Sequence, residues 1–243
     1  MITLDSVNKT IKKTILNSNH PNKVWSYSDF PQFSRTSVAK AYSNLYKAKL
    51  LSRQKRGLYY RSKKTILGDS IPDVEALAIA MAKQKSTFAC VSGLYGYNKL
   101  GLTTQVPNVI TIACDYPMRN TDRIRFILRE KPSSGTEIER IILDAIRDIH
   151  KIPDTTPDKI IFRIKKLLQS GKVNINDLGT SALKEPPSVK AVIGALGEEL
   201  KMKPEILESI RLAINPNTAV YLDVKNALPY AKNWRIKPRQ KKN

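Results

Sequence analysis

Residues 35–61 carry the side chains of this sequence that are best suited to recognising another molecule. They are hydroxyls and cations, and residues 34–49 contain no acid. Short hydroxyls and Lys or Arg side chains can bond base edges and phosphates, whereas phosphates repel carboxylates. This composition indicates non-covalent binding of a nucleic acid. The candidates for base edges are Thr36, Ser37, Lys40 and Ser43, and those for the phosphate backbone are Arg35, Lys47, Arg53, Lys55, Arg56 and Arg61.

These candidates require a helix that turns one face outward. Ser34 suits an N-cap, so a helix is predicted from there to about Lys49. At about 100° per residue the apolar side chains form one stripe, and the polar ones gather within about 60° on the opposite side. The apolar stripe consists of Val38, Ala41, Tyr42 and Leu45, and the outward group of Thr36, Lys40, Ser43 and Lys47.

A basic hairpin is predicted directly after this helix. Leu51 is expected to end its first strand, residues 54–57 to form the turn, and residues 58–60 to return as the second strand. Gly57 suits a turn position with positive φ. The hairpin tip carries Arg53, Lys55 and Arg56.

Two helices are predicted before the basic helix. Leu4, Val7, Ile11 and Ile15 recur at helical spacing, and residues 26–30 can form a short second helix. The order helix, short helix, basic helix and basic hairpin is that of a winged helix-turn-helix. A basic three-helix module that binds protein or RNA remains the alternative.

The distribution of charge supports a polyanionic partner. Residues 1–67 have a net charge of +12, residues 225–243 of +7, and the 157 residues between them of +2. A nearly neutral middle between two basic ends is typical of a chain whose ends meet a polyanion. The alternative is a generally basic composition that keeps the protein soluble. It does not explain why basic and acidic residues are nearly equal in number in the middle segment.

The remaining sequence predicts an α+β fold with a helical C-terminal portion. Residues 109–113 and 123–128 favour strands and together suggest a small sheet. Thr136 and Glu139 have the spacing of a capping box that opens a helix. Further helices are predicted over residues 73–83, from Ser92 to about 101, from Pro157 to about 170, and over 188–200 and 204–213.

Three parts are therefore expected along the chain. Residues 1–67 form the winged helix-turn-helix domain, residues 68–224 a larger α+β domain that is helical from about residue 136, and residues 225–243 a basic tail. The tail mixes Tyr230 and Trp234 with cations, and we expect it to be poorly ordered in isolation. It could be a second arm that contacts phosphate or a segment that docks on an acidic partner; a solvated terminus is the alternative.

Enzyme signatures are mostly absent from the sequence. It contains no Walker-type loop and no nucleophile elbow, and His20 and His150 lie in different segments. A nuclease-like metal cluster could be imagined from Asp115, Asp122, Glu130, Glu137 and Glu139, but the Glu-x-Lys that usually accompanies such sites is missing. We therefore expect no catalytic residues, no metal and no cofactor.

The sequence also favours a cytoplasmic protein. Its longest apolar run is about seven residues, Ala76 to Ala82, against the roughly 20 needed to cross a bilayer. Charged residues among the first 13 exclude the apolar core of a signal peptide. Cys90 and Cys114 are the only cysteines, and two buried thiols are expected rather than a disulfide framework.

Roughly residues 20–150 resemble the AbiEi-type antitoxins. The resemblance lies in residues 24–60, 68–72 and 91–107, and two runs within them are its most specific parts. These runs are Arg56-Gly57-Leu58-Tyr59-Tyr60 and Leu100-Gly101-Leu102-Thr103-Thr104-Gln105-Val106-Pro107. AbiEi-type proteins are the antitoxins of type IV toxin–antitoxin pairs of phage abortive infection, and they have a winged helix-turn-helix followed by a larger α+β domain.

The resemblance implies a function. Such proteins bind inverted repeats of double-stranded DNA in the promoter of their own gene pair and neutralise a nucleotidyltransferase-like toxin. We therefore expect a DNA-binding autorepressor and antitoxin, with a possible dimer on DNA. The alternative is a nucleic-acid-processing enzyme, nuclease-like and metal-dependent, or an RNA-binding protein that uses the middle domain.

Overall fold

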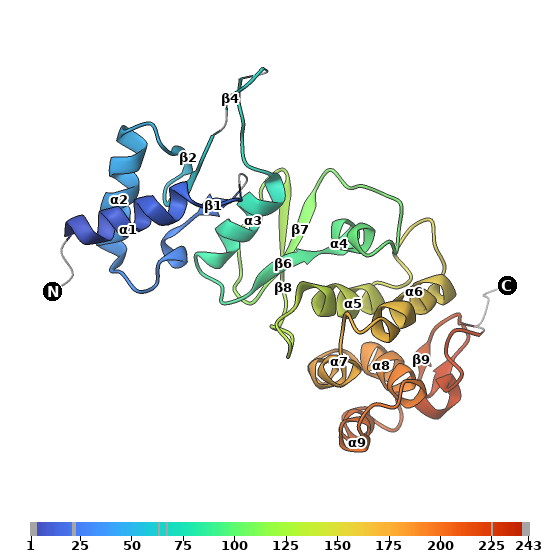
Figure 1. The fold of residues 1–243 in the computed structure, drawn as a ribbon. Helices are drawn as coiled ribbons and strands as arrows, with labels where there is room; N and C mark the ends of the chain where they lie inside the picture. Colours follow the sequence, from blue (N-terminus) through green and yellow to red (C-terminus); the bar gives the residue numbers. More distant parts are fainter. Residues whose placement is uncertain (1–3, 21–22, 63, 67, 225, 240–243) are drawn as a thin grey trace. The chain divides into compact units, whose positions relative to one another are not determined.

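The chain has an α+β fold, as its sequence predicts (Figure 1). The structure is a computed structural model that describes residues 4–20, 23–62, 64–66, 68–224 and 226–239. The chain divides into two compact units, unit 1 (Met1–Ala89) and unit 2 (Cys90–Asn243). Within the described ranges, no helix combines the length and the apolar character that crossing a membrane would require.

Unit 1 is built on two helices and a small antiparallel sheet. Helices α1 (Leu4–Leu16) and α2 (Arg35–Lys47) pack together and flank the short 3-10 helix η1 (Tyr27–Asp29) in the sequence. The sheet has the order β1 (Val24–Trp25), β3 (Leu58–Tyr60), β2 (Ser52–Lys55). These are the elements of a winged helix-turn-helix. Their shared core consists of Val7, Ile11, Ile15, Trp25, Phe30, Val38, Ala41, Tyr42, Leu45, Leu51 and Tyr59.

Two local predictions in unit 1 need correction. The segment expected to be a helix over residues 26–30 is a single 3-10 turn, in which Asp29 Oδ2 accepts the backbone N–H of Ser26 at 2.7 Å. The first strand of the hairpin runs from Ser52 to Lys55 instead of ending at Leu51, which is buried in the core. The hairpin turn is then the pair Arg56 and Gly57, with Gly57 at φ +82°.

Unit 1 extends beyond the helix-turn-helix elements. The strands β4 (Lys64–Thr65) and β5 (Gly68–Asp69) form a hairpin, and α3 (Val74–Lys83) follows. Ala80 of α3 packs in one apolar cluster with Val24 of β1 and Leu58 of β3. This contact makes α3 part of unit 1. The boundary expected at residue 67 lies outside the described residues, whereas the compact unit continues to Ala89.

The sheet of unit 2 has the order β6 (Ala89–Ser92), β7 (Ile110–Cys114), β8 (Ile124–Leu128). β7 and β8 are parallel, with Ile112 opposite Phe126. Helix α4 (Gly93–Lys99) packs on β7, and its other neighbour is α5 (Glu137–Arg147). Cys90 of β6 and Cys114 of β7 are free and buried, and burial raises the pKa of the Cys90 thiol.

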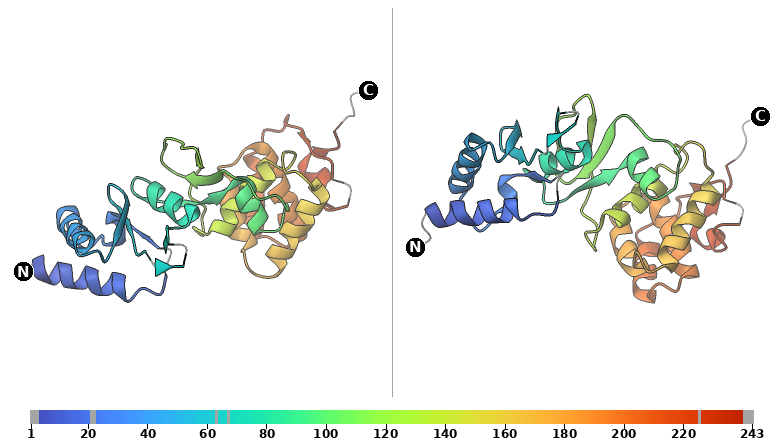
Figure 2. Two further views of the ribbon diagram at one scale, coloured as in Figure 1. Left: turned by 90° about the horizontal axis from the view of Figure 1, so that it is seen from above. Right: turned by 45° about the horizontal axis from the view of Figure 1, so that its top comes forward.

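Helices make up most of the remainder of unit 2. They are α6 (Pro157–Gln169), α7 (Ile175–Ala182), α8 (Pro187–Glu199) and α9 (Pro204–Leu212). Helix α8 is their centre, because α5, α7 and α9 all pack against it, and the views in Figure 2 show this gathering in yellow to red. All but α7 were predicted from the sequence.

The C-terminal segment is part of this fold rather than an unordered tail. β10 (Ile236–Lys237) pairs in parallel with β9 (Val220–Tyr221), and the 3-10 helix η2 (Ala231–Trp234) packs on α8. Trp234 is 3% exposed, and its Nε1–H donates to Glu198 Oε2 at 2.8 Å. The sequence-based expectation concerned the tail in isolation; in the full chain residues 226–239 pack on unit 2, and residues 225 and 240–243 lie outside the described residues.

A buried ion network ties α5 to the rest of unit 2. The guanidinium of Arg140, which is 1% exposed, donates to Asp144 Oδ1 at 2.9 Å and to Glu185 Oε1 at 2.8 Å. Asp144 also accepts Nε–H of Arg129 at 2.7 Å and the hydroxyl of Ser92 at 2.5 Å. Burial favours a higher pKa for the Glu185 carboxyl, but the hydrogen bond and the charge of Arg140 outweigh it and lower that pKa. The network thus joins β6, β8, α5 and the end of α7.

Replacing Arg140 by Met should lower the free energy of unfolding of unit 2 by about 2–4 kcal/mol, because the buried Asp144 and Glu185 would each lose one cation and keep only the partly exposed Arg129 and Arg147 as partners. Lys151→Met is the control, since the side chain of Lys151 is 80% exposed and pairs with Asp148 at the surface. Urea unfolding, followed by Trp234 fluorescence in a Trp25→Phe background, measures unit 2 alone. Equal midpoints for the two variants would show that the network does not stabilise the unit.

Candidate nucleic-acid interface

The N-terminus of α2 is organised by Ser34. The Ser34 hydroxyl accepts the backbone N–H of Ser37 at 3.2 Å, which satisfies one of the free donors at the helix start. It also donates to Ser37 Oγ at 2.8 Å and lies 3.0 Å from the hydroxyl of Thr36. Two of the four candidates for base edges therefore sit in the first turn and share a hydroxyl cluster with the N-cap.

The two faces of α2 are those that the sequence predicts. Val38, Ala41, Tyr42 and Leu45 are buried against the core. On the opposite side Thr36, Lys40 and Lys47 are exposed, and Ser43 is half-buried. The exposed face of the helix is therefore cationic and hydroxylic along three turns, with no carboxylate on it.

Tyr42 fixes how α2 sits in unit 1. It is fully buried, and its hydroxyl donates to the backbone oxygen of Ser26 at 2.7 Å. Its ring centroid lies 4.9 Å from that of Tyr59 on β3 and 6.3 Å from that of Phe30. Burial, with a smaller effect of the nearby Asp29 carboxylate, raises the pKa of Tyr42, so the hydroxyl stays a donor. One side chain thus links α2, η1 and the hairpin.

The β2–β3 hairpin carries its cations next to α2. Arg53, Lys55 and Arg56 are all exposed. The ladder is irregular between Arg53 and Lys55, and such a bulge increases the local twist of the strand. The ring of Tyr46, near the end of α2, lies 6.5 Å from that of Tyr59, so the hairpin and the last turn of α2 are in contact.

The two remaining arginine candidates have partners within unit 1. Arg35 lies over the ring of Tyr27, with 5.1 Å between the guanidinium carbon and the ring centroid, and remains exposed. Arg61 is half-buried and donates through one nitrogen to the backbone oxygens of Ile15 at 3.4 Å and Leu16 at 2.9 Å. Arg61 thus caps the C-terminus of α1, a structural role that its place in the sequence does not reveal.

Sequence reasoning did not select two cations of α1. Lys9 and Lys12 line a hollow of about 230 Å³ with Asn44 and Leu50, along the groove between α1 and α2. Both lysines are exposed. Their i, i+3 spacing, with no acid among residues 6–28, is the signal that could have identified them.

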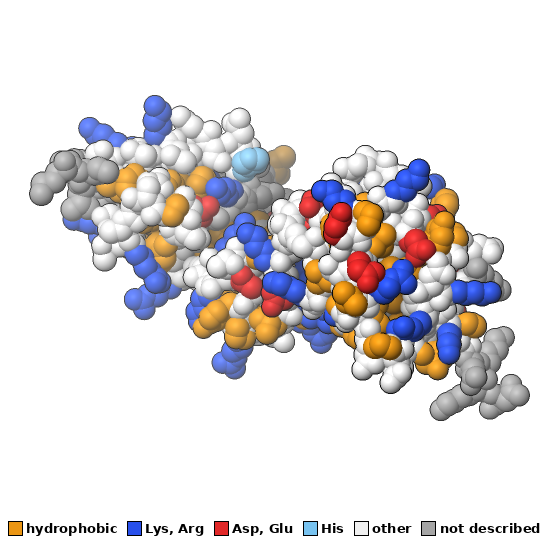
Figure 3. Space-filling view, turned by 90° about the horizontal axis from the view of Figure 1, so that it is seen from below, with side chains coloured by type: hydrophobic (Ala, Val, Ile, Leu, Met, Phe, Trp, Pro, Cys, Tyr) orange, Lys and Arg blue, Asp and Glu red, His pale blue; other side chains and the backbone are white. Residues whose placement is uncertain are grey.

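Five cations of this face have no carboxylate partner among the described residues. Unit 1 contains 16 Lys and Arg residues against five acids. Within the described part of the chain, Lys40, Lys47, Arg53, Lys55 and Arg56 make no ion pair, since Asp29 pairs instead with Lys23 at 3.2 Å. Figure 3 shows exposed Lys and Arg side chains projecting from unit 1. Unpaired cations raise the local positive potential, which favours an anionic partner.

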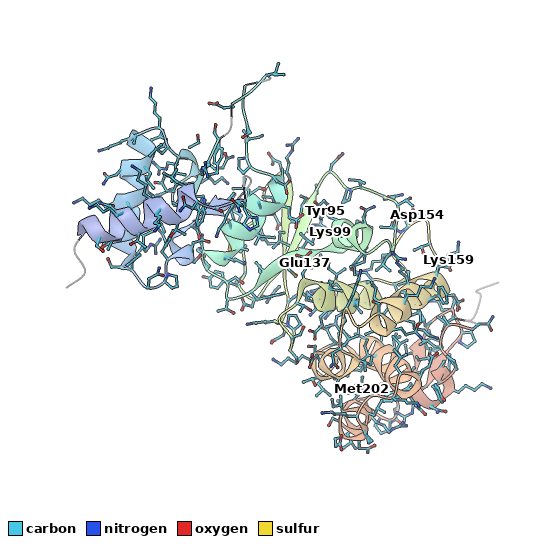
Figure 4. All side chains as sticks on the ribbon, viewed as in Figure 1. Tyr95, Lys99, Glu137, Asp154, Lys159 and Met202 are labelled. Carbon is cyan, nitrogen blue, oxygen red and sulfur yellow. The ribbon has the colours of Figure 1, made fainter. Side chains whose placement is uncertain are left out.

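Three of the five acids that could be imagined as a nuclease cluster have partners within unit 2. Glu139 is buried and accepts from the hydroxyls of Ser134 and Ser181, while Glu130 pairs with Lys184 at 3.0 Å. Glu137 pairs with Lys99 at 2.9 Å, and Figure 4 shows these two side chains on neighbouring helices. Across the described residues, no three His, Cys, Asp or Glu side chains gather as a metal ion would require.

Residues 100–107, one of the two most specific runs of the family resemblance, form hydrogen bonds with Asp154. Asp154 Oδ1 accepts the hydroxyl of Thr103 at 2.5 Å, and Oδ2 accepts the backbone N–H of Thr104 at 2.8 Å. The hydroxyl of Thr104 donates to the same oxygen, and these bonds lower the pKa of Asp154. The two threonines thus tie this loop to the segment before α6.

Comparison with known proteins gives a family. The model of the family DUF6088, described as a family of unknown function, matches residues 10–177, so the chain belongs to that family. No curated protein matches the sequence. Among solved structures, "Crystal structure of RV2827C protein from Mycobacterium tuberculosis" aligns with a TM-score of 0.43 and 11% identity, over 88% of this chain and 83% of that one. A similarity of this size carries no argument about function.

Removing the hydroxyl of Tyr42 tests its role in unit 1. Tyr42→Phe should lower the free energy of unfolding of unit 1 by about 0.5–1.5 kcal/mol, because the carbonyl of Ser26 loses one of its two donors and keeps only the N–H of Asp29. Tyr46→Phe is the control, since Tyr46 is 49% exposed. Trp25 fluorescence in a Trp234→Phe background follows unit 1 during urea unfolding. If Tyr42→Phe unfolds at the same midpoint as Tyr46→Phe, this hydrogen bond does not hold α2 in place.

Proposed function

We propose that this DUF6088 protein binds double-stranded DNA, with α2 in the major groove and the β2–β3 hairpin on the adjacent backbone. The observation that carries the proposal is the acid-free outward face of α2 beside a hairpin with three unpaired, exposed cations. A helix fits the major groove, where each base pair presents its own pattern of donors and acceptors. A carboxylate on this face would be repelled by phosphate.

The candidate residues divide into two roles under this proposal. Thr36, Ser37, Lys40 and Ser43 would meet base edges, because they lie on the outward side or in the first turn of α2. Flanking cations would hold phosphates and set the register of the helix. These cations are Arg35, Lys47, Arg53, Lys55 and Arg56, joined by Lys9 and Lys12 of α1. Arg61 would contribute only through donors that its contacts with α1 leave available.

The regulatory part of the proposal rests on the resemblance to AbiEi-type antitoxins. The run over residues 56–60 forms the turn and second strand of the hairpin, and the run over residues 100–107 forms a loop of unit 2. We infer that the protein represses the promoter of its own gene pair in the cytoplasm and neutralises a nucleotidyltransferase-like toxin. Binding to inverted repeats would place two copies of the chain on one operator.

Binding to promoter DNA should depend steeply on salt. If the interface neutralises about six phosphates, the logarithm of the binding constant should fall against the logarithm of salt concentration with a slope near −5. Fluorescence anisotropy with duplex DNA from upstream of its own gene measures this slope. A slope shallower than about −2 would contradict the DNA proposal, and tighter binding of RNA of the same sequence would favour an RNA-binding protein instead.

Variants should separate base reading from backbone contact. Lys55→Ala and Arg56→Ala should weaken promoter and random DNA equally, each reducing the salt slope by about one unit. Lys40→Ala and Ser43→Ala should instead narrow the difference in affinity between the two DNAs by about 1–3 kcal/mol. Lys172→Ala, an exposed cation of unit 2, is the control and should change neither quantity. Equal losses on both DNAs for all four interface variants would mean that α2 does not read bases.

Substitutions in the full chain should separate repression of the promoter from neutralisation of the toxin. The cationic face belongs to unit 1, whereas unit 2 has its own core and ion network. A Lys40→Ala/Ser43→Ala double variant should therefore lose repression of a promoter reporter but still protect cells that express the neighbouring toxin gene. Cell death despite normal levels of the variant would indicate that protection requires the DNA-binding face or that the protein is no antitoxin.

A further inference from the structure

Unit 2 contains a cleft whose charged lining is entirely cationic. The cleft has a volume of about 300 Å³ and lies between residues 216–219 and the segment that forms η2 and β10. Its charged lining residues are Lys232, Arg235 and Lys237, and its polar ones include Asn217 and Thr218. The three cations are exposed. This arrangement offers both charge and neutral hydrogen-bonding groups to an anion.

The cations are mounted on a fixed framework. Trp234 and Ile236 are buried and alternate along the chain with exposed Arg235 and Lys237. The ring of Trp234 packs so closely on Gly194 of α8 that a Cβ built there would lie 2.3 Å from the indole. The pairing of Ile236 with Val220 holds the far side of the cleft. The packing of Trp234 and the pairing of β10 with β9 therefore hold the segment that carries the three cations.

Arg235 occupies a backbone conformation that a glycine or asparagine would adopt more readily. Its φ is +55°, and it lies where η2 ends and β10 begins. Its backbone oxygen accepts the N–H of Val220 at 3.1 Å, and its guanidinium reaches the backbone oxygen of Asn215 at 3.5 Å. These two hydrogen bonds hold Arg235 in the lining of the cleft.

No carboxylate in the described part of the chain pairs with the cations of the cleft. Within the described ranges, Lys232, Arg235 and Lys237 have no ion-pair partner. The neighbouring acids have other contacts, since Glu198 accepts from Trp234 and Asn233, and Asp223 accepts the backbone N–H of Arg239. Three like charges around one hollow repel each other, and a bound anion relieves that repulsion.

We infer that this cleft is a second phosphate-binding site, which holds the phosphodiester backbone of the nucleic acid that unit 1 binds. The inference rests on the proposed DNA binding, which it extends to unit 2. Backbone contacts of this kind add affinity without reading sequence. Phosphate contacts on unit 2 would add to those of the winged helix.

The test is a triple variant of the full-length chain, Lys232→Gln/Arg235→Asn/Lys237→Gln. Asparagine tolerates the positive φ of position 235, so the backbone is preserved while the charge is removed. The matched control is Lys131→Gln/Lys172→Gln/Lys201→Asn, which removes the same charge from exposed positions and also changes a residue at φ +56°. Circular dichroism and thermal unfolding should be the same for both triple variants.

The readout is the salt slope on a long promoter duplex. The salt slope of the cleft variant should be shallower than that of the control by about two to three units, because each lost phosphate contact reduces the slope by about 0.9. A slope equal to that of the control overturns the inference. A Lys55→Ala/Arg56→Ala variant in the same series tests unit 1 separately, because an unchanged slope in that variant would count against the proposed function and not against the cleft.

Inorganic phosphate distinguishes the two sources of the anion. We expect the charge-matched control variant, in which the cleft is intact, to bind inorganic phosphate only weakly. DNA should displace this phosphate from the cleft. If the control binds phosphate and the cleft variant does not, while both have the same salt slope on DNA, the cleft holds a free anion and the nucleic-acid inference is wrong. Titration followed by phosphorus NMR measures both the binding and the displacement.

Discussion

The burial of Tyr42 is the interaction on which the arrangement of unit 1 depends. Its ring fills the space between α2, η1 and β3, and its hydroxyl satisfies the backbone oxygen of Ser26. A helix as short as α2 has little stability by itself and takes its orientation from such packing. Because Tyr42 occupies the inward side, Lys40 and Ser43 are turned outward beside the hairpin cations. The proposed chemistry of the surface thus follows from one buried side chain.

Unit 2 obtains its order from a different kind of interaction. The buried guanidinium of Arg140 connects α5 with Glu185, which follows the end of α7, and Asp144 connects α5 with β6 and with Arg129, which follows β8. Such a network defines one arrangement of its elements, because any displacement leaves a charge buried without a partner. The basic cleft at the C-terminal end then presents cations from a rigid support. Both units therefore combine an ordered interior with unpaired surface cations.

Local sequence patterns predicted most of the helices, the β2–β3 hairpin and the strands β7 and β8, but not the shorter strands or the contacts that connect the elements. The two faces of α2 followed from residue spacing, and Thr136 caps α5 as expected. Glu139, expected to complete that capping box, is instead bonded to Ser134 and Ser181. Helix α7 was missed because it has only eight residues, including Gly179 and Thr180, and therefore no long apolar stripe.

The contacts that sequence reasoning missed join residues far apart in the chain. Glu185 lies 45 residues from Arg140, so no local pattern connects them. The role of Arg61 at the end of α1 and the packing of Trp234 on α8 are long-range contacts of the same kind. The candidate cations were found from composition, helical spacing and the predicted hairpin. What each of them touches depends on the tertiary fold.

Amide chemical shifts of the nitrogen-15-labelled full chain, recorded with and without promoter duplex, test the central claim most directly. Each amide reports its own surroundings, so the measurement locates the DNA on the protein without a substitution. The account predicts the largest changes in α2 and in the β2–β3 hairpin, with small changes in the core of unit 1. Changes confined to unit 2, with α2 and the hairpin unaffected at saturating DNA, would contradict it.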